Sequence, residues 1–124
     1  MNGNKLFLDT NIILYLLNGD QTLAELLNEK QLYISVITEL ELLAYKGITR
    51  EEEEIINEFV SQCKIITINN AVKQETIKVR KIYNTKLPDS IIIATALYLD
   101  LPLITSDIEF KKVNELALIH YENN

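Results

Sequence analysis

Four carboxylates stand where apolar segments of this sequence give way to helical ones. Asp9 ends a short apolar run, and Asp107 lies two residues beyond another. Asp89 follows a proline at the expected start of a helix, and Glu41 lies with Glu39 in the helix expected after a further apolar run. In a sheet of parallel strands, the ends of such runs meet at one edge. We therefore expect Asp9, Glu41, Asp89 and Asp107 to share one site.

A cluster of carboxylates has a specific chemical use. Several carboxylates held together repel one another, so one or more takes up a proton unless a cation joins them. Hard oxygen ligands suit Mg²⁺ or Mn²⁺, which can activate a water molecule and neutralise charge on a phosphate. Acyl transfer would need a nucleophile–base pair, and the only histidine, His120, lies away from the other candidates. The acids thus favour in-line hydrolysis of a phosphodiester.

Each acid also has a simpler interpretation at a helix terminus. Asp9 and Asp107 could be ordinary N-caps, and Asp89 could complement the helix dipole. Thr38 and Glu41 have the spacing of a capping box. A carboxylate directly after a buried strand is costly without a partner, which weighs against simple capping for Asp9. Four independent caps would not need to converge on one edge, so their convergence favours the shared site over capping alone.

The elements that position these acids alternate between short apolar runs and amphipathic helices. Strands are expected at residues 6–8, 32–36, 63–68, 101–105 and 116–121. Helices are expected at 12–17, around 23–27 and 40–44, at 49–60 behind a Thr49–Glu52 capping box, at 72–86, from 88 to 97, and briefly after 107. Strands alternating with helices, with near-continuous apolar cores, predict a three-layer α/β/α sandwich with a parallel sheet of about five strands.

Composition bounds the class of protein. The 124 residues suit a single domain spanning 1–124, and 48% hydrophobic with 24% charged residues argues against disorder. One cysteine, Cys63, excludes an internal disulfide framework. The longest apolar stretch, residues 91–99, is far short of the roughly 20 residues that span a bilayer. We expect a cytoplasmic protein that does not bind membranes.

The charge distribution is uneven. The net charge of −6 counts against nucleic-acid binding, although a bound metal would offset part of it. Residues 51–54 and 58 are an acidic block, which is expected to be a solvated helix face. Residues 73–86 carry five basic residues against one acidic residue. This basic helix is a candidate track for RNA, or equally a solvated face.

The order of four motifs resembles a known family. The motifs are FLDTN at 7–11, SVITELEL at 35–42, LPDSIIIATAL at 87–97 and LITSDIEF at 103–110. Their order and spacing resemble PIN-domain proteins, and most nearly the VapC-type toxins of bacterial toxin–antitoxin pairs. The resemblance covers essentially the whole chain. It implies the α/β/α fold and a Mg²⁺- or Mn²⁺-dependent endoribonuclease that cuts RNA, often tRNA or rRNA.

The resemblance also implies roles for individual residues and partners. Asp9, Glu41, Asp89 and Asp107 match the metal-binding catalytic acids, and Glu41 fits the family pattern better than Glu39. The resemblance implies supporting or substrate-binding roles for Asn11, Thr105 and Ser106. It further implies a homodimer and a small antitoxin protein that blocks the site.

Two other functions remain open from the sequence. A phosphatase with an aspartyl nucleophile would use an acid after the first strand, but the D-x-D pattern of such enzymes is broken here by Asn11. A PIN-like fold could also serve as a non-catalytic module that binds RNA or protein. The presence of all four acids argues against that module without excluding it.

Overall fold

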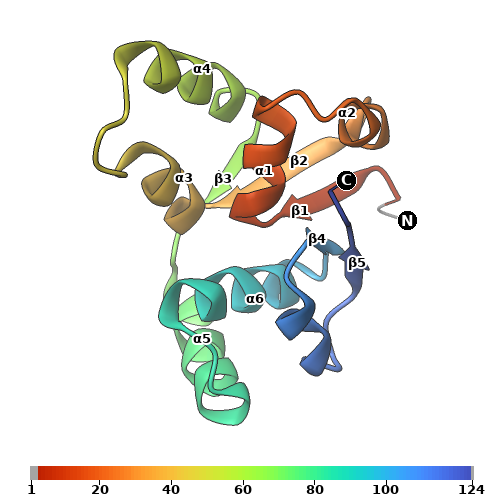
Figure 1. Ribbon diagram of the computed structural model, residues 1–124. Coiled ribbons are helices and arrows are strands. Elements are labelled where there is room, and N and C mark those ends of the chain that lie inside the picture. Colours follow the sequence, from red (N-terminus) through yellow and green to blue (C-terminus); the bar gives the residue numbers. More distant parts are fainter. Residues whose placement is uncertain (1–2, 124) are drawn as a thin grey trace.

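A five-stranded parallel sheet forms the centre of the protein. The computed structural model describes residues 3–123. The strands pair in the order β3-β2-β1-β4-β5, and every pairing is parallel (Figure 1). Their bounds are β1 Lys5–Leu8, β2 Gln31–Ser35, β3 Lys64–Ile66, β4 Leu103–Thr105 and β5 Leu118–His120.

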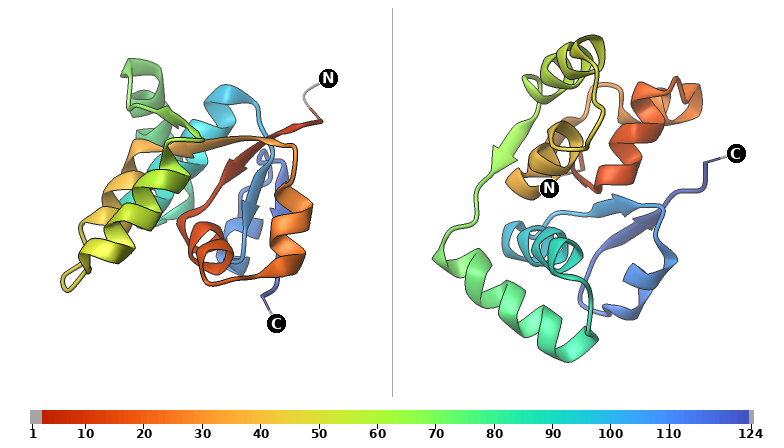
Figure 2. Two further views of the ribbon diagram at one scale, coloured as in Figure 1. Left: turned by 90° about the horizontal axis from the view of Figure 1, so that it is seen from above. Right: turned by 60° about the vertical axis from the view of Figure 1, so that its left-hand side comes forward.

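Helices cover both faces of this sheet. They are α1 Thr10–Leu17, α2 Gln21–Leu27, α3 Val36–Leu43, α4 Arg50–Val60, α5 Asn70–Tyr83, α6 Leu87–Leu99 and the 3₁₀ helix η1 Ile108–Lys112. Figure 2 shows α1–α4 on one side of the strands and α5, α6 and η1 on the other. The predicted α/β/α sandwich is therefore confirmed.

Alternating side chains of the strands build two separate cores. Leu6 and Leu8 of β1 pack with buried residues of α1–α4, such as Ile13. Phe7, between them, packs on the other face with Ile92 of α6 and with buried residues of α5 and η1. Because successive side chains of a strand point to opposite faces, a central strand buried on both sides must be apolar throughout. The run LFL in β1 meets this requirement.

The order in which the chain adds strands to the sheet reverses between β1 and β4. From β1 the chain adds β2 and β3 on one side, then crosses through α5 and α6 to place β4 on the other side of β1. Leu8 of β1 is paired with Ile104 of β4. In doubly wound sheets the connections leave such neighbouring strands on opposite faces, which opens a crevice at their carboxyl ends. Asp9 and Thr105 lie at the carboxyl ends of these two strands.

Several predicted boundaries differ from the structure. Strands β3 and β5 are shorter than the expected 63–68 and 116–121. The basic helix ends at Tyr83, not at Lys86, because Asn84 adopts a left-handed conformation (φ 54°) that asparagine tolerates and that terminates helices. The Thr38–Glu41 capping box is also wrong. The helix α3 begins earlier, at Val36, where the hydroxyl of Ser35 accepts from the backbone N–H of Ile37.

Other local predictions are confirmed. Thr49 and Glu52 form a reciprocal capping box at the start of α4, with both hydrogen bonds present. The acidic block of α4, residues 51–54 and 58, is exposed. Within residues 3–123, no helix is both long and apolar enough to cross a membrane.

Candidate functional site

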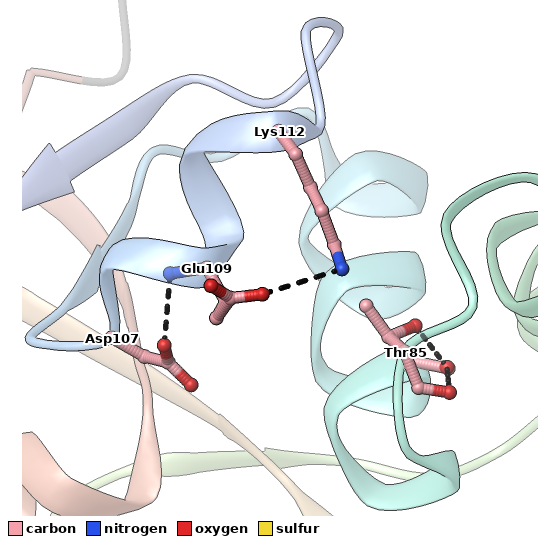
Figure 3. A network of polar contacts seen from close by, with 5 residues as sticks. Thr85, Asp107, Glu109 and Lys112 are labelled. Carbon is pink, nitrogen blue, oxygen red and sulfur yellow. Dashed lines mark hydrogen bonds and ion pairs between the residues drawn. The ribbon is translucent and has the colours of Figure 1, made fainter.

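Thr105 links the carboxyl ends of β1 and β4. The side chain of Asp9 is 5% exposed and caps α1, where its Oδ1 accepts from the N–H of Thr10 at 2.8 Å. The hydroxyl of Thr105 donates to Oδ2 of Asp9 at 2.5 Å and accepts from the backbone N–H of Asp107 at 3.0 Å. Asp107 in turn caps η1 by accepting from the N–H of Glu109 at 2.9 Å (Figure 3). One buried hydroxyl thus connects two of the predicted acids.

A second hydroxyl connects this site to α3. Thr10 Oγ1 donates to Oε1 of Glu41 at 2.8 Å and lies 3.0 Å from the hydroxyl oxygen of Thr38. Thr38 is completely buried, whereas Glu41 is exposed. The start of α1 therefore orients the carboxylate of Glu41, with Thr38 as a fixed support beneath it.

Asp89 lies in the first turn of α6, which a pair of buried hydroxyl groups holds in place. The hydroxyl oxygens of Thr85 and Ser90 are 2.5 Å apart, and the Ser90 hydroxyl also contacts the carbonyl of Lys86 at 2.9 Å. The guanidinium of Arg80 donates to the carbonyl of Thr85 at 2.5 Å. These contacts fix the turn that joins α5 to α6, marked by Thr85 in Figure 3. They thereby fix the position of the first turn of α6, which carries Asp89.

The charges of the four acids act on one another. Burial raises the pKa of Asp9 from 3.8 to about 6, the hydrogen bonds from Thr105 and Thr10 oppose this, and the charges of Asp89 and Asp107 raise it further. Burial, followed by the charges of Asp107 and Glu41, also raises the pKa of Asp89. The four predicted acids, from four different segments, therefore share one electrostatic field.

The donor set fits a hard divalent cation in its chemistry. All four groups are carboxylates, which Mg²⁺ and Mn²⁺ prefer. The charge of Lys86 opposes the raised pKa of Asp89. A cation would relieve the repulsion that adds to the effect of burial on the pKa of Asp9 and Asp89. Across residues 3–123, however, no three acidic, histidine or cysteine side chains already stand close enough together to enclose a metal. The carboxylates border a common region without forming a closed cage.

The other residues predicted for the site, Asn11, Ser106 and Glu39, differ in exposure and in hydrogen-bond partners. Asn11 is exposed in the first turn of α1. Ser106 Oγ is 3.2 Å from the hydroxyl of Tyr15, and its carbonyl lies 3.3 Å from Nε2 of His120. Glu39 is half-buried in the first turn of α3. Of the two glutamates, Glu41 is the one whose carboxylate accepts from the hydroxyl of Thr10.

Sequence reasoning missed three positioning hydroxyls. Thr10, Thr38 and Ser90 each lie within three residues of a predicted acid and contact groups that orient it. Their signal in the sequence is a small hydroxyl residue beside a carboxylate at the start of a helix. That signal is weak by itself, because the same residues commonly cap helices without any site.

The fold and the position of the four acids define a class of protein. It is a doubly wound α/β protein with an acidic site at the topological switch point of its sheet. Within that class, the family model of the PIN domain matches residues 6–116. The chain belongs to the PIN domain family. No curated protein sequence matches the chain significantly.

Several solved structures that share this fold come from toxin–antitoxin systems. A chain of a toxin–antitoxin complex from Klebsiella pneumoniae is 30% identical, with a TM-score of 0.82 over 95% of this chain and 99% of that chain. A chain of VapBC2 from Rickettsia felis, bound to a promoter DNA fragment, is 21% identical, with a TM-score of 0.85 over 95% of this chain and 99% of that chain. VapBC-1 from nontypeable Haemophilus influenzae is 23% identical, with a TM-score of 0.77 over 94% of this chain and 97% of that chain. The resemblance to VapC-type PIN proteins is thus confirmed.

Proposed function

We propose that this protein is a Mg²⁺- or Mn²⁺-dependent endoribonuclease and the toxin of a toxin–antitoxin pair. One observation carries the proposal: Asp9, Glu41, Asp89 and Asp107 come from four segments and act on one another electrostatically at the switch point of the sheet. A fold has no structural need to gather four like charges there, since their repulsion adds to the rise that burial causes in the pKa of Asp9 and Asp89. Binding of a divalent cation and a phosphodiester gives this arrangement a chemical purpose.

Each residue has a defined part in this proposal. The carboxylates of Asp9, Glu41, Asp89 and Asp107 hold the cation, and they position it without attacking the substrate. When bound, Mg²⁺ or Mn²⁺ supplies an activated water and neutralises charge on the phosphate. Thr105 holds Oδ2 of Asp9 at 2.5 Å and so limits its rotation. This constraint keeps Oδ2 in one orientation before any ligand arrives.

The partners follow from the same proposal. The 30% identical relative is a chain of a toxin–antitoxin complex, which supports a cognate antitoxin for this protein. The family resemblance supports a homodimer and an RNA substrate such as tRNA or rRNA. An RNA of either kind would be met in the cytoplasm, so the proposal includes that location.

An RNA cleavage assay tests the proposal directly. Protein freed of any co-purifying partner is incubated with total tRNA and rRNA in Mn²⁺, in Mg²⁺ and in EDTA. Asp9→Asn is the inactive variant, and Glu25→Gln, an exposed acid of α2, is the matched control. Discrete fragments are expected from the wild type and from Glu25→Gln in either metal. None are expected in EDTA or from Asp9→Asn.

The outcomes also separate the alternative functions. Undiminished cleavage by Asp9→Asn would remove Asp9 from the mechanism. A folded wild type that binds Mn²⁺ but cuts neither RNA pool would favour the non-catalytic binding module. A covalent acyl-phosphate on Asp9 after incubation with a phosphomonoester would favour the phosphatase, although exposed Asn11 offers no acid where that mechanism needs one.

A further inference from the structure

Charge is divided unequally between the two helical layers. Residues 9–63, which contain α1–α4, carry 11 acidic residues against three basic ones. Residues 64–123, which contain α5, α6 and η1, carry eight basic residues against seven acidic ones, and two of those acids belong to the site. By net charge, a polyanion is therefore repelled by the α1–α4 layer and not by the α5–α6–η1 layer.

Five exposed basic residues lie on segments that border the acidic site. We call them the basic ridge: Arg80 and Lys81 in the last turn of α5, Lys86 at the N-cap of α6, and Lys111 and Lys112 in the last turn of η1. The ridge therefore combines the end of one helix, the start of the next and a separate 3₁₀ helix.

The first two of these segments meet at Asp89. Lys86 lies three residues before Asp89, and its positive charge acts on that carboxylate. Arg80 donates to the carbonyl of Thr85, which folds the last turn of α5 onto the turn that leads into α6. The basic end of α5 is thereby held next to the first turn of α6, which carries Asp89.

The third segment starts at another acid of the site. The helix η1 begins with Asp107 as its N-cap and ends with Lys111 and Lys112. The hydroxyl of Tyr83, the last residue of α5, donates to the carboxylate of Glu115, just after η1. In Figure 3, Lys112 extends from η1 in the direction of the turn before α6, with Glu109 as its ion-pair partner at 3.6 Å. The helix that Asp107 caps thus ends in two basic groups, as the turn before Asp89 carries Lys86.

We propose that the basic ridge holds the phosphate backbone of single-stranded RNA as it enters the acidic site from the α5–α6–η1 side. This inference rests on the proposed function for the identity of the polyanion. Phosphates next to the scissile one contact the lysines of the ridge, while the acidic α1–α4 layer repels the strand and excludes the opposite approach. The net charge of −6 is then compatible with RNA binding, because repulsion is concentrated on the layer that RNA does not touch.

Two triple variants with the same change in net charge test the ridge. The ridge variant is Lys81→Gln/Lys86→Gln/Lys111→Gln, whose side chains make no hydrogen bond or ion pair within residues 3–123. The control is Lys30→Gln/Lys46→Gln/Arg50→Gln, which removes all three basic residues of residues 9–63. Fluorescence anisotropy in EDTA, where metal-dependent cleavage does not run, measures binding of a labelled single-stranded RNA oligonucleotide across a NaCl series.

The expected effect follows from counterion release. Each phosphate contact on single-stranded nucleic acid contributes about 0.7 to the slope of log affinity against log salt. Loss of three contacts should lower the slope by about 2 and weaken binding about 100-fold at 0.1 M salt. The control variant should keep the wild-type slope, with only a small general loss of affinity. Circular dichroism of both variants checks that they are folded.

Three outcomes of the binding measurement would overturn the ridge. Equal losses in the two triple variants would show that only net charge matters. No loss in the ridge variant would refute RNA contact and make an acidic protein the alternative occupant. No RNA binding by the wild type would also refute it. Cleavage in Mn²⁺ is measured separately, which distinguishes the two proposals. If RNA binding depends on the ridge but no RNA is cut, the proposed nuclease activity is refuted and the ridge is not. If RNA is cut but the ridge variant binds it as well as the wild type, the ridge is refuted and the nuclease activity is not.

Discussion

Replacing Asp9 with asparagine should stabilise the metal-free protein, although Asp9 is the centre of the proposed site. The fold raises the pKa of Asp9 from 3.8 to about 6, chiefly by burial, so the folded state disfavours the charged carboxylate. A difference of this size corresponds to about 3 kcal/mol of destabilisation once the group is fully ionised. Asparagine removes the charge and is an equally good N-cap for the N–H of Thr10.

The net gain is smaller than the pKa alone suggests. The hydroxyl of Thr105 donates to Oδ2 of Asp9 at 2.5 Å, and an amide nitrogen at that position cannot accept. Loss of this hydrogen bond costs about 1 kcal/mol, which leaves a stabilisation of about 2 kcal/mol near pH 7. For a chain of this length that should raise Tm by roughly 5–10 °C.

The pH dependence has a definite sign. Below about pH 4 the carboxyl is protonated in both states and contributes nothing to the difference between them. As the pH rises from about 4 to about 6, the unfolded chain releases its proton before the folded one, so wild-type stability falls. Above about pH 6 the penalty is complete. The advantage of Asp9→Asn should therefore grow across this window and then remain constant.

Urea unfolding in EDTA at several pH values between 4 and 8 measures this difference. Glu25→Gln, which removes an exposed carboxylate from α2, is the control and should follow the wild type at every pH. A wild type more stable than Asp9→Asn at pH 8 would refute the reasoning, because it would mean that the fold favours the charge on Asp9. A difference that does not change with pH would refute it equally.

Three further outcomes are expected. Mn²⁺ at 100 times its Kd should stabilise the wild type by about 2.7 kcal/mol and Asp9→Asn much less; equal rises in Tm would place the ion elsewhere. Thr105→Val should weaken Mn²⁺ binding measured by calorimetry and destabilise the fold by about 1–3 kcal/mol, since it leaves the N–H of Asp107 without its acceptor, whereas Thr105→Ser should retain both properties. Thr10→Val should release Glu41 and weaken Mn²⁺ binding, with recovery in Thr10→Ser; identical Mn²⁺ affinity in the two variants would show that the Thr10 hydroxyl does not position Glu41.

Much of the architecture could be predicted from local patterns. The run LFL at 6–8 predicts a central buried strand because only apolar side chains satisfy both faces of a covered sheet. Thr49 and Glu52 predict the start of α4 because their capping hydrogen bonds involve residues three apart. Such features depend on near neighbours in the chain, so the sequence carries them without reference to the rest of the fold.

Boundaries were predicted less well where two local signals compete. Thr38 and Glu41 match a capping box, but Ser35 caps α3 first and leaves Thr38 buried inside the helix. The basic run continues to Lys86, but the left-handed Asn84 ends α5 before it. In each case a neighbouring residue stabilises a helix end more effectively than the expected one, and pattern alone does not rank the two.

By itself, the sequence determined which acids stand at the ends of apolar runs and that a parallel sheet would carry Asp9 and Asp107 to one edge. Only the tertiary structure decided how they are held. The hydroxyl of Thr105 reaches an acid 96 residues away, and that of Thr10 reaches Glu41, 31 residues away. The raised pKa of Asp9 likewise comes from burial beneath elements distant in the chain. Hydrogen bonds and desolvation depend on distances of a few ångströms, and only the folded chain fixes such distances between remote residues.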